Sequence, residues 1–116
     1  MTDPSPPLGA PNSVSLYLNL RTLQLGGPHG RIDVSDSECR LLKALAASTD
    51  QRVDAALLLE HVGKRYDAAA KRALGVQFVR LRKRLAQAGA PSPTIKSIRG
   101  QGYQLCVPIE ILLSTS

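Results

Sequence analysis

The chain has 116 residues and is 43% hydrophobic, which is sufficient for one domain with a single core. Three Tyr, one Phe and no Trp are too few aromatic residues for a surface that stacks the bases of single-stranded nucleic acid. The net charge of +6 is unevenly placed, because residues 61–104 contain ten Lys and Arg but one Asp, a balance of +9 that leaves −3 for the rest. A patch of this sign attracts a polyanion, either nucleic-acid phosphates or anionic lipid, although an ordinary solvated face has the same composition.

The N-terminus and the cysteines carry no sign of a membrane or secretory protein. Four prolines and few apolar residues predict a flexible leader at 1–12, without the basic and apolar segments of a signal peptide. The apolar runs are too short to span a membrane. Cys39 and Cys106 have neither metal-site nor disulfide spacing, so we expect two buried thiols in a cytoplasmic protein.

The folded domain is expected at 13–108, and it begins with short strands. Alternating apolar residues predict strands at 13–20 and 21–25 that each have one buried face. A break rich in Gly follows, after which RIDV at 31–34 predicts a third strand. The N-terminal part of the domain is therefore expected to be a sheet.

Two core helices are expected next. The sequence Ser35-Asp36-Ser37-Glu38 has the S-x-x-E spacing of a capping box, which predicts the start of a helix. Asp54 can cap a second helix over 56–66. The residues expected to face the core are Leu41, Leu42 and Leu45 in the first helix and Leu57, Leu58 and Val62 in the second.

A third helix is expected from about Ala69 to Ala88, and it contains the most basic stretch of the chain. An apolar stripe with spacing i, i+4, i+7 and i+11 predicts the side that packs on the core, namely Leu74, Phe78, Leu81 and Leu85. The same helical period places Arg72, Val76, Val79, Arg80 and Lys83 on the opposite side. Arg82 and Arg84 are expected on the two flanks.

A β-hairpin is expected after the third helix. Two alternating runs, at 94–100 and 102–107, are joined across glycines, which is typical of a hairpin. Arg99 lies at its tip, next to the first of these glycines. A basic helix followed by a hairpin can grip a duplex through two grooves. The remaining residues, 109–116, are expected to form a short C-terminal tail.

Three blocks of sequence carry a family resemblance: Glu38 with Leu41-Leu42, Arg72 with RLRKRL at 80–85, and Ile95 with IRGQGYQL at 98–105. Together they resemble the winged-helix effector domain of OmpR/PhoB-type transcription factors, over almost the whole chain. The resemblance implies an α+β fold, a winged helix-turn-helix with an N-terminal antiparallel sheet, three helices and a C-terminal β-hairpin wing. It also implies sequence-specific binding of double-stranded DNA, regulation of transcription and no cofactor.

In that family the third helix lies in the major groove and the wing reaches the adjacent minor groove. By position, Arg80 becomes the base reader, Val76 a contact for a thymine methyl group, and Arg99 the minor-groove arginine. A guanidinium can donate two parallel bonds to guanine O6 and N7, and a narrow A·T minor groove attracts cations. Arg72 and Arg82 become candidate phosphate ligands. The full candidate set is Arg72, Val76, Val79, Arg80, Arg82, Lys83, Lys96 and Arg99.

Four positions depart from the family pattern, namely Gly63, Gly75, Gln77 and Gln104, and they concern which DNA sequence is read. No receiver-like segment precedes the fold, so we expect either a stand-alone regulator or an excised effector domain. Without that dimerisation element, we expect a monomer in solution that pairs on DNA. RNA polymerase is a further expected partner, because 63–70 resembles the family's polymerase-contacting loop.

Three other classes of protein are alternatives to this interpretation. An enzyme would need a nucleophile with a base, a carboxylate pair or a phosphate-binding loop, and the sequence contains none of these, nor a set of metal ligands. A membrane-surface role is disfavoured because the basic helix uses its apolar stripe for the core. The remaining alternative is a protein-interaction module that has kept the winged-helix fold, lost DNA binding, and binds a partner regulator or RNA polymerase.

Overall fold

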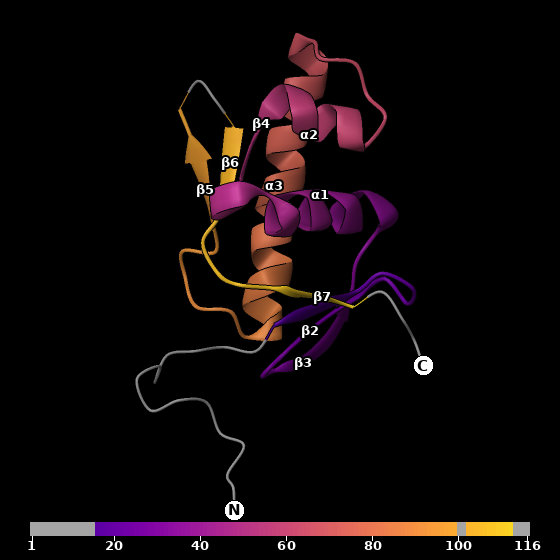
Figure 1. The fold of residues 1–116 in the computed structure, drawn as a ribbon, viewed down its shortest axis with the longest axis vertical. Coiled ribbons are helices and arrows are strands. Elements are labelled where there is room, and N and C mark those ends of the chain that lie inside the picture. Colours follow the sequence, from indigo (N-terminus) through magenta and orange to yellow (C-terminus); the bar gives the residue numbers. More distant parts are fainter. Residues whose placement is uncertain (1–15, 100–101, 113–116) are drawn as a thin grey trace, which may run out of the picture.

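The computed structural model, which describes residues 16–99 and 102–112, contains three helices and two β-sheets, with the larger sheet at one end of the helices and the smaller sheet beside them (Figure 1). The leader expected at 1–12 lies outside the described residues. The helices are α1 (Asp36–Ala47), α2 (Ala55–His61) and α3 (Ala68–Ala88), with a 3₁₀ turn at Thr49–Gln51. The strands are β1 (Tyr17–Asn19), β2 (Gln24–Gly27), β3 (Gly30–Asp33), β4 (Arg52–Asp54), β5 (Ile95–Ile98), β6 (Gly102–Leu105) and β7 (Glu110–Leu112).

The two sheets have different strand orders. The larger has the order β3-β2-β1-β7, in which β1, β2 and β3 are antiparallel neighbours and β7 runs parallel to β1. The smaller is antiparallel, with the order β4-β6-β5, and its hairpin β5-β6 is the wing. The predicted α+β winged helix-turn-helix is therefore confirmed, with one parallel strand added to the N-terminal sheet.

The C-terminal residues differ from the expected tail. Residues 110–112 form β7, where Glu110 is opposite Tyr17 and Ile111 is opposite Leu18. A three-residue strand carries too little alternation to be recognised in a sequence, and its partner lies at the other end of the chain. The boundary expected at residue 108 therefore falls before a strand that belongs to the larger sheet.

The second strand begins later than predicted, because residues 20–23 form a turn. The side-chain oxygen of Asn19 accepts hydrogen bonds from the backbone N–H groups of Arg21 and Thr22, at 2.9 and 3.1 Å. This is the local bonding by which Asn favours turns over strands. Leu23 completes the turn with a φ of 55°, and β2 starts only at Gln24.

Side chains cap the start of each helix. Ser35 Oγ accepts from the Glu38 backbone N–H at 3.0 Å, and Glu38 Oε1 accepts from the Ser35 N–H at 2.8 Å, so the predicted capping box is present. Asp54 caps α2 as predicted, and Asp67 caps α3. The second helix ends at His61 rather than near residue 66, because Gly63 follows with a φ of 73°, a left-handed conformation that ends helices.

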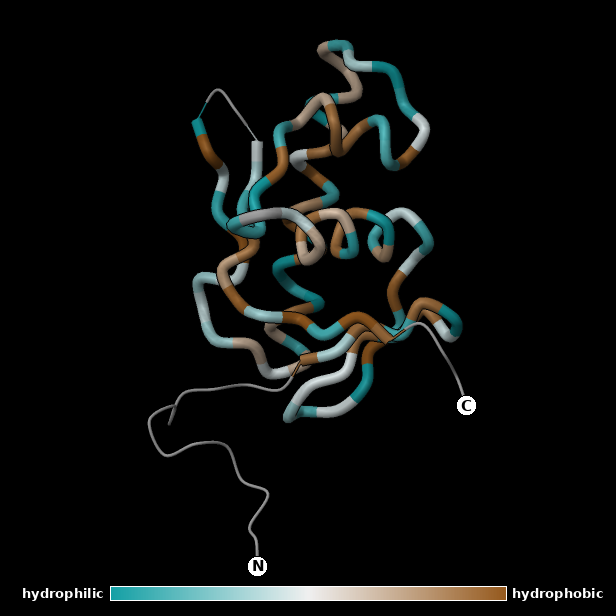
Figure 2. The backbone as a smooth tube through the Cα atoms, in the orientation of Figure 1, coloured by the Kyte–Doolittle hydropathy of each residue, from teal (hydrophilic) through white to brown (hydrophobic). Residues whose placement is uncertain are grey.

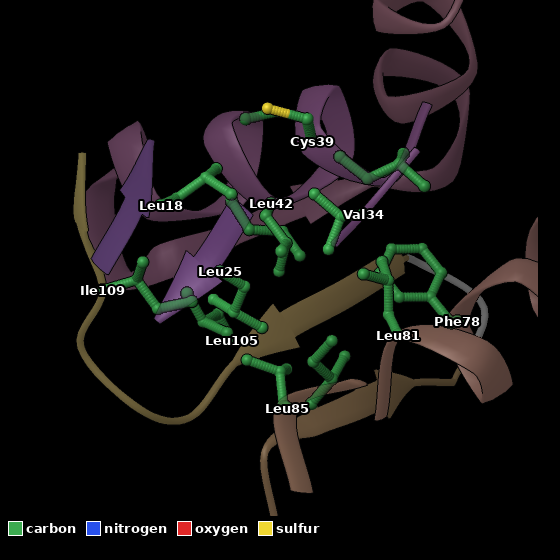
Figure 3. Packing of buried hydrophobic residues seen from close by; sticks show 14 of the residues in the cluster. Leu18, Leu25, Val34, Cys39, Leu42, Phe78, Leu81, Leu85, Leu105 and Ile109 are labelled. Carbon is green, nitrogen blue, oxygen red and sulfur yellow. The ribbon is translucent and has the colours of Figure 1, made fainter. Parts of the chain in front are cut away.

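The core lies where the helices meet both sheets, and Figure 3 shows side chains from α1, α3 and the strands packed together. All the core residues predicted in α1 and α3 are buried. In α2 the prediction is wrong for Leu57, which is 44% exposed, whereas the neighbouring Leu58 and Leu59 are buried. Three consecutive leucines in a seven-residue helix do not specify which two face inward, so packing decides.

The two cysteines also differ from each other. Cys39 is buried in the core as predicted, and burial raises the pKa of its thiol, with a further contribution from Asp36. Cys106 is only half-buried, because it follows β6 where the chain leaves the smaller sheet. The structure records both as free thiols.

Candidate nucleic-acid interface

The third helix and the wing pack against each other along one side of α3. The ring of Phe78 stacks on that of Tyr103 in β6, with centroids 3.9 Å apart and an interplanar angle of 17°. Four residues further along α3, Arg82 Nε donates to the Ile95 carbonyl oxygen at 3.0 Å, and its Nη2 lies 3.4 Å from Ser97 Oγ. These contacts fix the direction of the wing relative to α3.

The side of α3 opposite its core-facing stripe is exposed and carries most of the candidate residues. Val76 and Val79 are 54% and 49% exposed, which is unusual for large apolar side chains in a folded domain. The basic residues that surround them, Arg72, Arg80 and Lys83, are exposed as well. The structure therefore brings together five predicted residues on one basic face with two apolar side chains at its centre.

Two of the four cations in RLRKR do not belong to that face. Arg82 lies against β5, as described above. Arg84 points toward α1, where its Nε lies 3.5 Å from Oε1 of the buried Glu38. This Nε is itself buried and makes no hydrogen bond to any described residue, so the contact is ionic. The basic stretch is thus divided into exposed cations, Arg80 and Lys83, and cations that tie α3 to neighbouring elements.

Strand β4 holds the wing along β6 as far as Gly102, the first residue after the hairpin tip. Gly102 pairs with Asp54 of β4, and a Cβ atom at this glycine would lie 2.2 Å from the Val53 carbonyl oxygen. Only glycine allows the two backbones to approach so closely. Lys96 and Arg99 are exposed, and Arg99 follows directly after β5. The hairpin therefore carries its two predicted cations to the surface beside α3.

A cavity of about 240 Å³ lies between the N-terminal part of α3 and the wing. Lys71 and Arg99 line it, together with Tyr66, Ser97 and Tyr103. The ammonium group of Lys71 lies over the ring of Tyr66, 5.5 Å from its centre. Sequence reasoning missed Lys71 and Tyr66, although Lys71 continues the spacing of the wing-facing residues of α3 by one turn.

The cavity opens near the loop between α2 and α3, which Figure 2 shows as mainly hydrophilic.

Among residues 16–99 and 102–112, His, Cys, Asp and Glu side chains do not gather into a set of three that could hold a metal ion. In the same part of the chain, every helix is too short or too polar to cross a membrane.

The sequence also matches a known family. Residues 29–105 match the family described as "Transcriptional regulatory protein, C terminal". The chain belongs to this family. The predicted resemblance to OmpR/PhoB-type effector domains is thereby confirmed, and the matched region contains the helices and the wing. No curated protein matches this sequence significantly.

Three solved members of the same structural class are similar to this chain. The DNA-binding domain of CpxR from E. coli is 26% identical, with a TM-score of 0.69, over 91% of this chain and 98% of that one. The C-terminal domain of the nisin resistance regulator NsrR is 28% identical, with a TM-score of 0.63, over 78% and 90%. The Klebsiella pneumoniae RstA DNA-binding domain, solved in complex with the RstA box, is 31% identical, with a TM-score of 0.57, over 71% and 81%.

Proposed function

We propose that this chain places α3 in the major groove of double-stranded DNA and its wing in the adjacent minor groove. Its functional class is that of the family, a sequence-specific DNA-binding regulator of transcription, as the sequence predicts. The observation that carries the proposed geometry is the exposed basic face of α3, next to a wing held in a defined direction by Arg82 and Tyr103. An α-helix fits the major groove, and a hairpin tip can enter the minor groove.

Arg80 is the proposed base reader. It is exposed in the middle of α3, beside Val76 and Val79, so its guanidinium is available for a guanine edge. Bidentate bonds from arginine to O6 and N7 distinguish guanine from the other bases. In contrast to Arg82 and Arg84, Arg80 has no ion-pair or hydrogen-bond partner among the described residues that would compete for it.

Val76 and Val79 supply the apolar part of the proposed readout. They lie three residues apart on the exposed face, so both can approach the same stretch of groove. Thymine presents the only methyl group in the major groove, and apolar side chains recognise it by contact. We therefore expect preferred sites to contain thymines next to the guanine contacted by Arg80.

The remaining candidates are assigned to the minor groove and to the phosphates of the DNA backbone. Arg99 is the proposed minor-groove residue, because it stands at the exposed end of β5 near the hairpin tip. Arg72, Lys83 and Lys96 are exposed and are assigned to phosphates. Two N–H groups of Arg82 are already used in bonds to Ile95 and Ser97, so only its remaining N–H groups can bind a phosphate.

The assembly and setting follow from the same proposal. The protein acts in the cytoplasm, is a monomer in solution, and pairs on half-sites about one helical turn apart. Its contact with RNA polymerase uses the loop between α2 and α3. A protein-interaction module that has lost DNA binding is the second candidate, and the exposed side chains of Leu57 in α2 and Tyr66 in this loop favour it.

Selection of binding sites from random-sequence duplexes, followed by gel-shift titration at several salt concentrations, tests the proposal. If about six phosphates are neutralised, the logarithm of affinity falls with the logarithm of salt concentration at a slope near −5. Enrichment of a guanine-containing motif supports base readout. Binding that does not depend on salt, or failure to enrich any motif, would favour the protein-interaction module instead.

A further inference from the structure

The side of α3 that faces the wing is in contact with it at Arg82 and Phe78 but is separated from it by a cavity at Lys71. It carries Lys71, Gly75, Phe78 and Arg82, which are spaced by four, three and four residues. Arg82 is bonded to β5, and Phe78 is stacked on Tyr103. Gly75 has no side chain, and a Cβ atom there would be 3.8 Å from the Tyr103 hydroxyl oxygen. Beyond it, at Lys71, the two elements diverge and the cavity of about 240 Å³ begins.

The chemistry of this cavity suits an anion. Lys71 and Arg99 supply positive charge from its two sides, one from α3 and one from the wing. Ser97 and Tyr103 add hydroxyl groups, and none of the described residues that line it is acidic. The volume is several times the roughly 30 Å³ that a water molecule occupies, so a phosphate group with some of its water can enter.

The state of Lys71 supports the same conclusion. Its ammonium group lies over the ring of Tyr66, 5.5 Å from the centre, and pairs with no carboxylate of residues 16–99 and 102–112. An aromatic face attracts and orients a cation without neutralising it. The N–H donors of Lys71 therefore remain available for a ligand, while Tyr66 limits the directions in which the long side chain can point.

We propose that this cavity seats a phosphate of the DNA strand that separates the two grooves, with Lys71 as its donor and Tyr66 as a positioning residue. The inference rests on the proposed function. When a helix occupies the major groove and a wing the adjacent minor groove, the backbone between those grooves crosses the space between the two elements. The cavity is that space.

The first test replaces single phosphates of a selected duplex by neutral methylphosphonates and measures the affinity of the wild-type chain and of Lys71→Gln. One position is expected at which the wild-type chain loses about tenfold in affinity, and Lys71→Gln shows this loss on the unmodified duplex but no further loss on the modified one. The salt slope of Lys71→Gln is expected to be smaller by about 0.9. Lys43→Gln, the same change at an exposed lysine of α1, is the matched control and keeps wild-type affinity.

The second test addresses Tyr66. Tyr66→Phe keeps an aromatic ring and is expected to bind as the wild-type chain does, whereas Tyr66→Leu loses part of the affinity that Lys71→Gln loses. Wild-type affinity for Lys71→Gln, or equal methylphosphonate losses in both chains at every position, overturns the phosphate seat and leaves the proposed function standing. Failure of the wild-type chain itself to bind any selected duplex overturns both.

Discussion

Arg80 and Arg84 are one helical turn apart on α3, yet their surroundings differ. Arg80 is exposed beside two exposed valines, Val76 and Val79. Arg84 is half-buried, and its Nε lies 3.5 Å from a carboxylate that is 3% exposed and that also completes the capping box of α1. The same residue type therefore serves the proposed interface in one region of the helix and the packing of helices in the other. Charge density in a sequence does not by itself measure the size of a binding surface.

The largest expected effect lies in the buried region. Glu38→Ala removes the acceptor of the Ser35 N–H group and leaves the buried Nε of Arg84 without an opposite charge. We expect the free energy of unfolding to fall by about 3 kcal/mol, as measured by urea denaturation. DNA affinity of the folded protein should not change.

The exposed pair Arg40 and Asp36 provides the control for this prediction. Their side chains are 2.7 Å apart on the surface of α1, and both are more than half exposed. Arg40→Ala is expected to change the free energy of unfolding by less than about 0.5 kcal/mol. An effect of Glu38→Ala as small as that of Arg40→Ala would show that the buried contact does not hold α1 to α3.

The second prediction concerns the exposed arginine of the pair, Arg80. Arg80→Ala is expected to weaken binding to a selected site by about 2 kcal/mol and to relax the preference at one major-groove position. Its free energy of unfolding should equal that of the wild-type chain. Repeating the site selection with the variant checks the result, and an unchanged motif would remove Arg80 from the readout.

Arg99 in the wing is a second exposed arginine, and we expect its replacement to reduce DNA affinity in a different way. Arg99→Ala is expected to cost about 1 kcal/mol on sites flanked by A·T tracts and less where G·C pairs replace them. Titration on both duplexes and on non-specific DNA measures the difference. Equal losses for Arg80→Ala and Arg99→Ala on all three duplexes would mean that these charges act only as a diffuse patch.

The exposed valines allow a test at the level of single atoms. Replacing thymine by deoxyuridine removes only the C5-methyl group, and we expect a loss of about 0.8 kcal/mol for each methyl group that Val76 or Val79 contacts. Val76→Ala and Val79→Ala should each abolish the sensitivity at one position. If both variants remain as sensitive to deoxyuridine as the wild-type chain, the valines do not face thymine.

The smallest effect separates two adjacent cations. Lys83 is exposed, whereas Arg84 is directed toward Glu38. Lys83→Ala is therefore expected to reduce the salt slope of DNA binding by about 0.9, and Arg84→Ala to leave it unchanged. Parallel salt titrations decide the matter, and a reduced slope for Arg84→Ala would return this arginine to the interface.

Features whose causes lie within a few residues could be predicted from the sequence. The capping box at Ser35 and Glu38, the cap at Asp54 and the apolar stripe of α3 depend on spacings of three and four residues, which are visible in the chain itself. The wing hairpin depends on alternation and on glycines between its strands. The basic face of α3 follows from the same helical period, and its members are exposed because that period places them opposite the core stripe.

Features whose causes lie far apart in the chain were decided only by the tertiary structure. The pairing of β7 with β1, the choice of Leu59 over Leu57 for the core, and the partners of Arg82 and Arg84 all depend on which distant segments come together. The cavity at Lys71 exists because α3 and the wing diverge beyond Gly75. A helical period gives the direction of a side chain around its own axis, but burial and charge pairing depend on what the fold places opposite it.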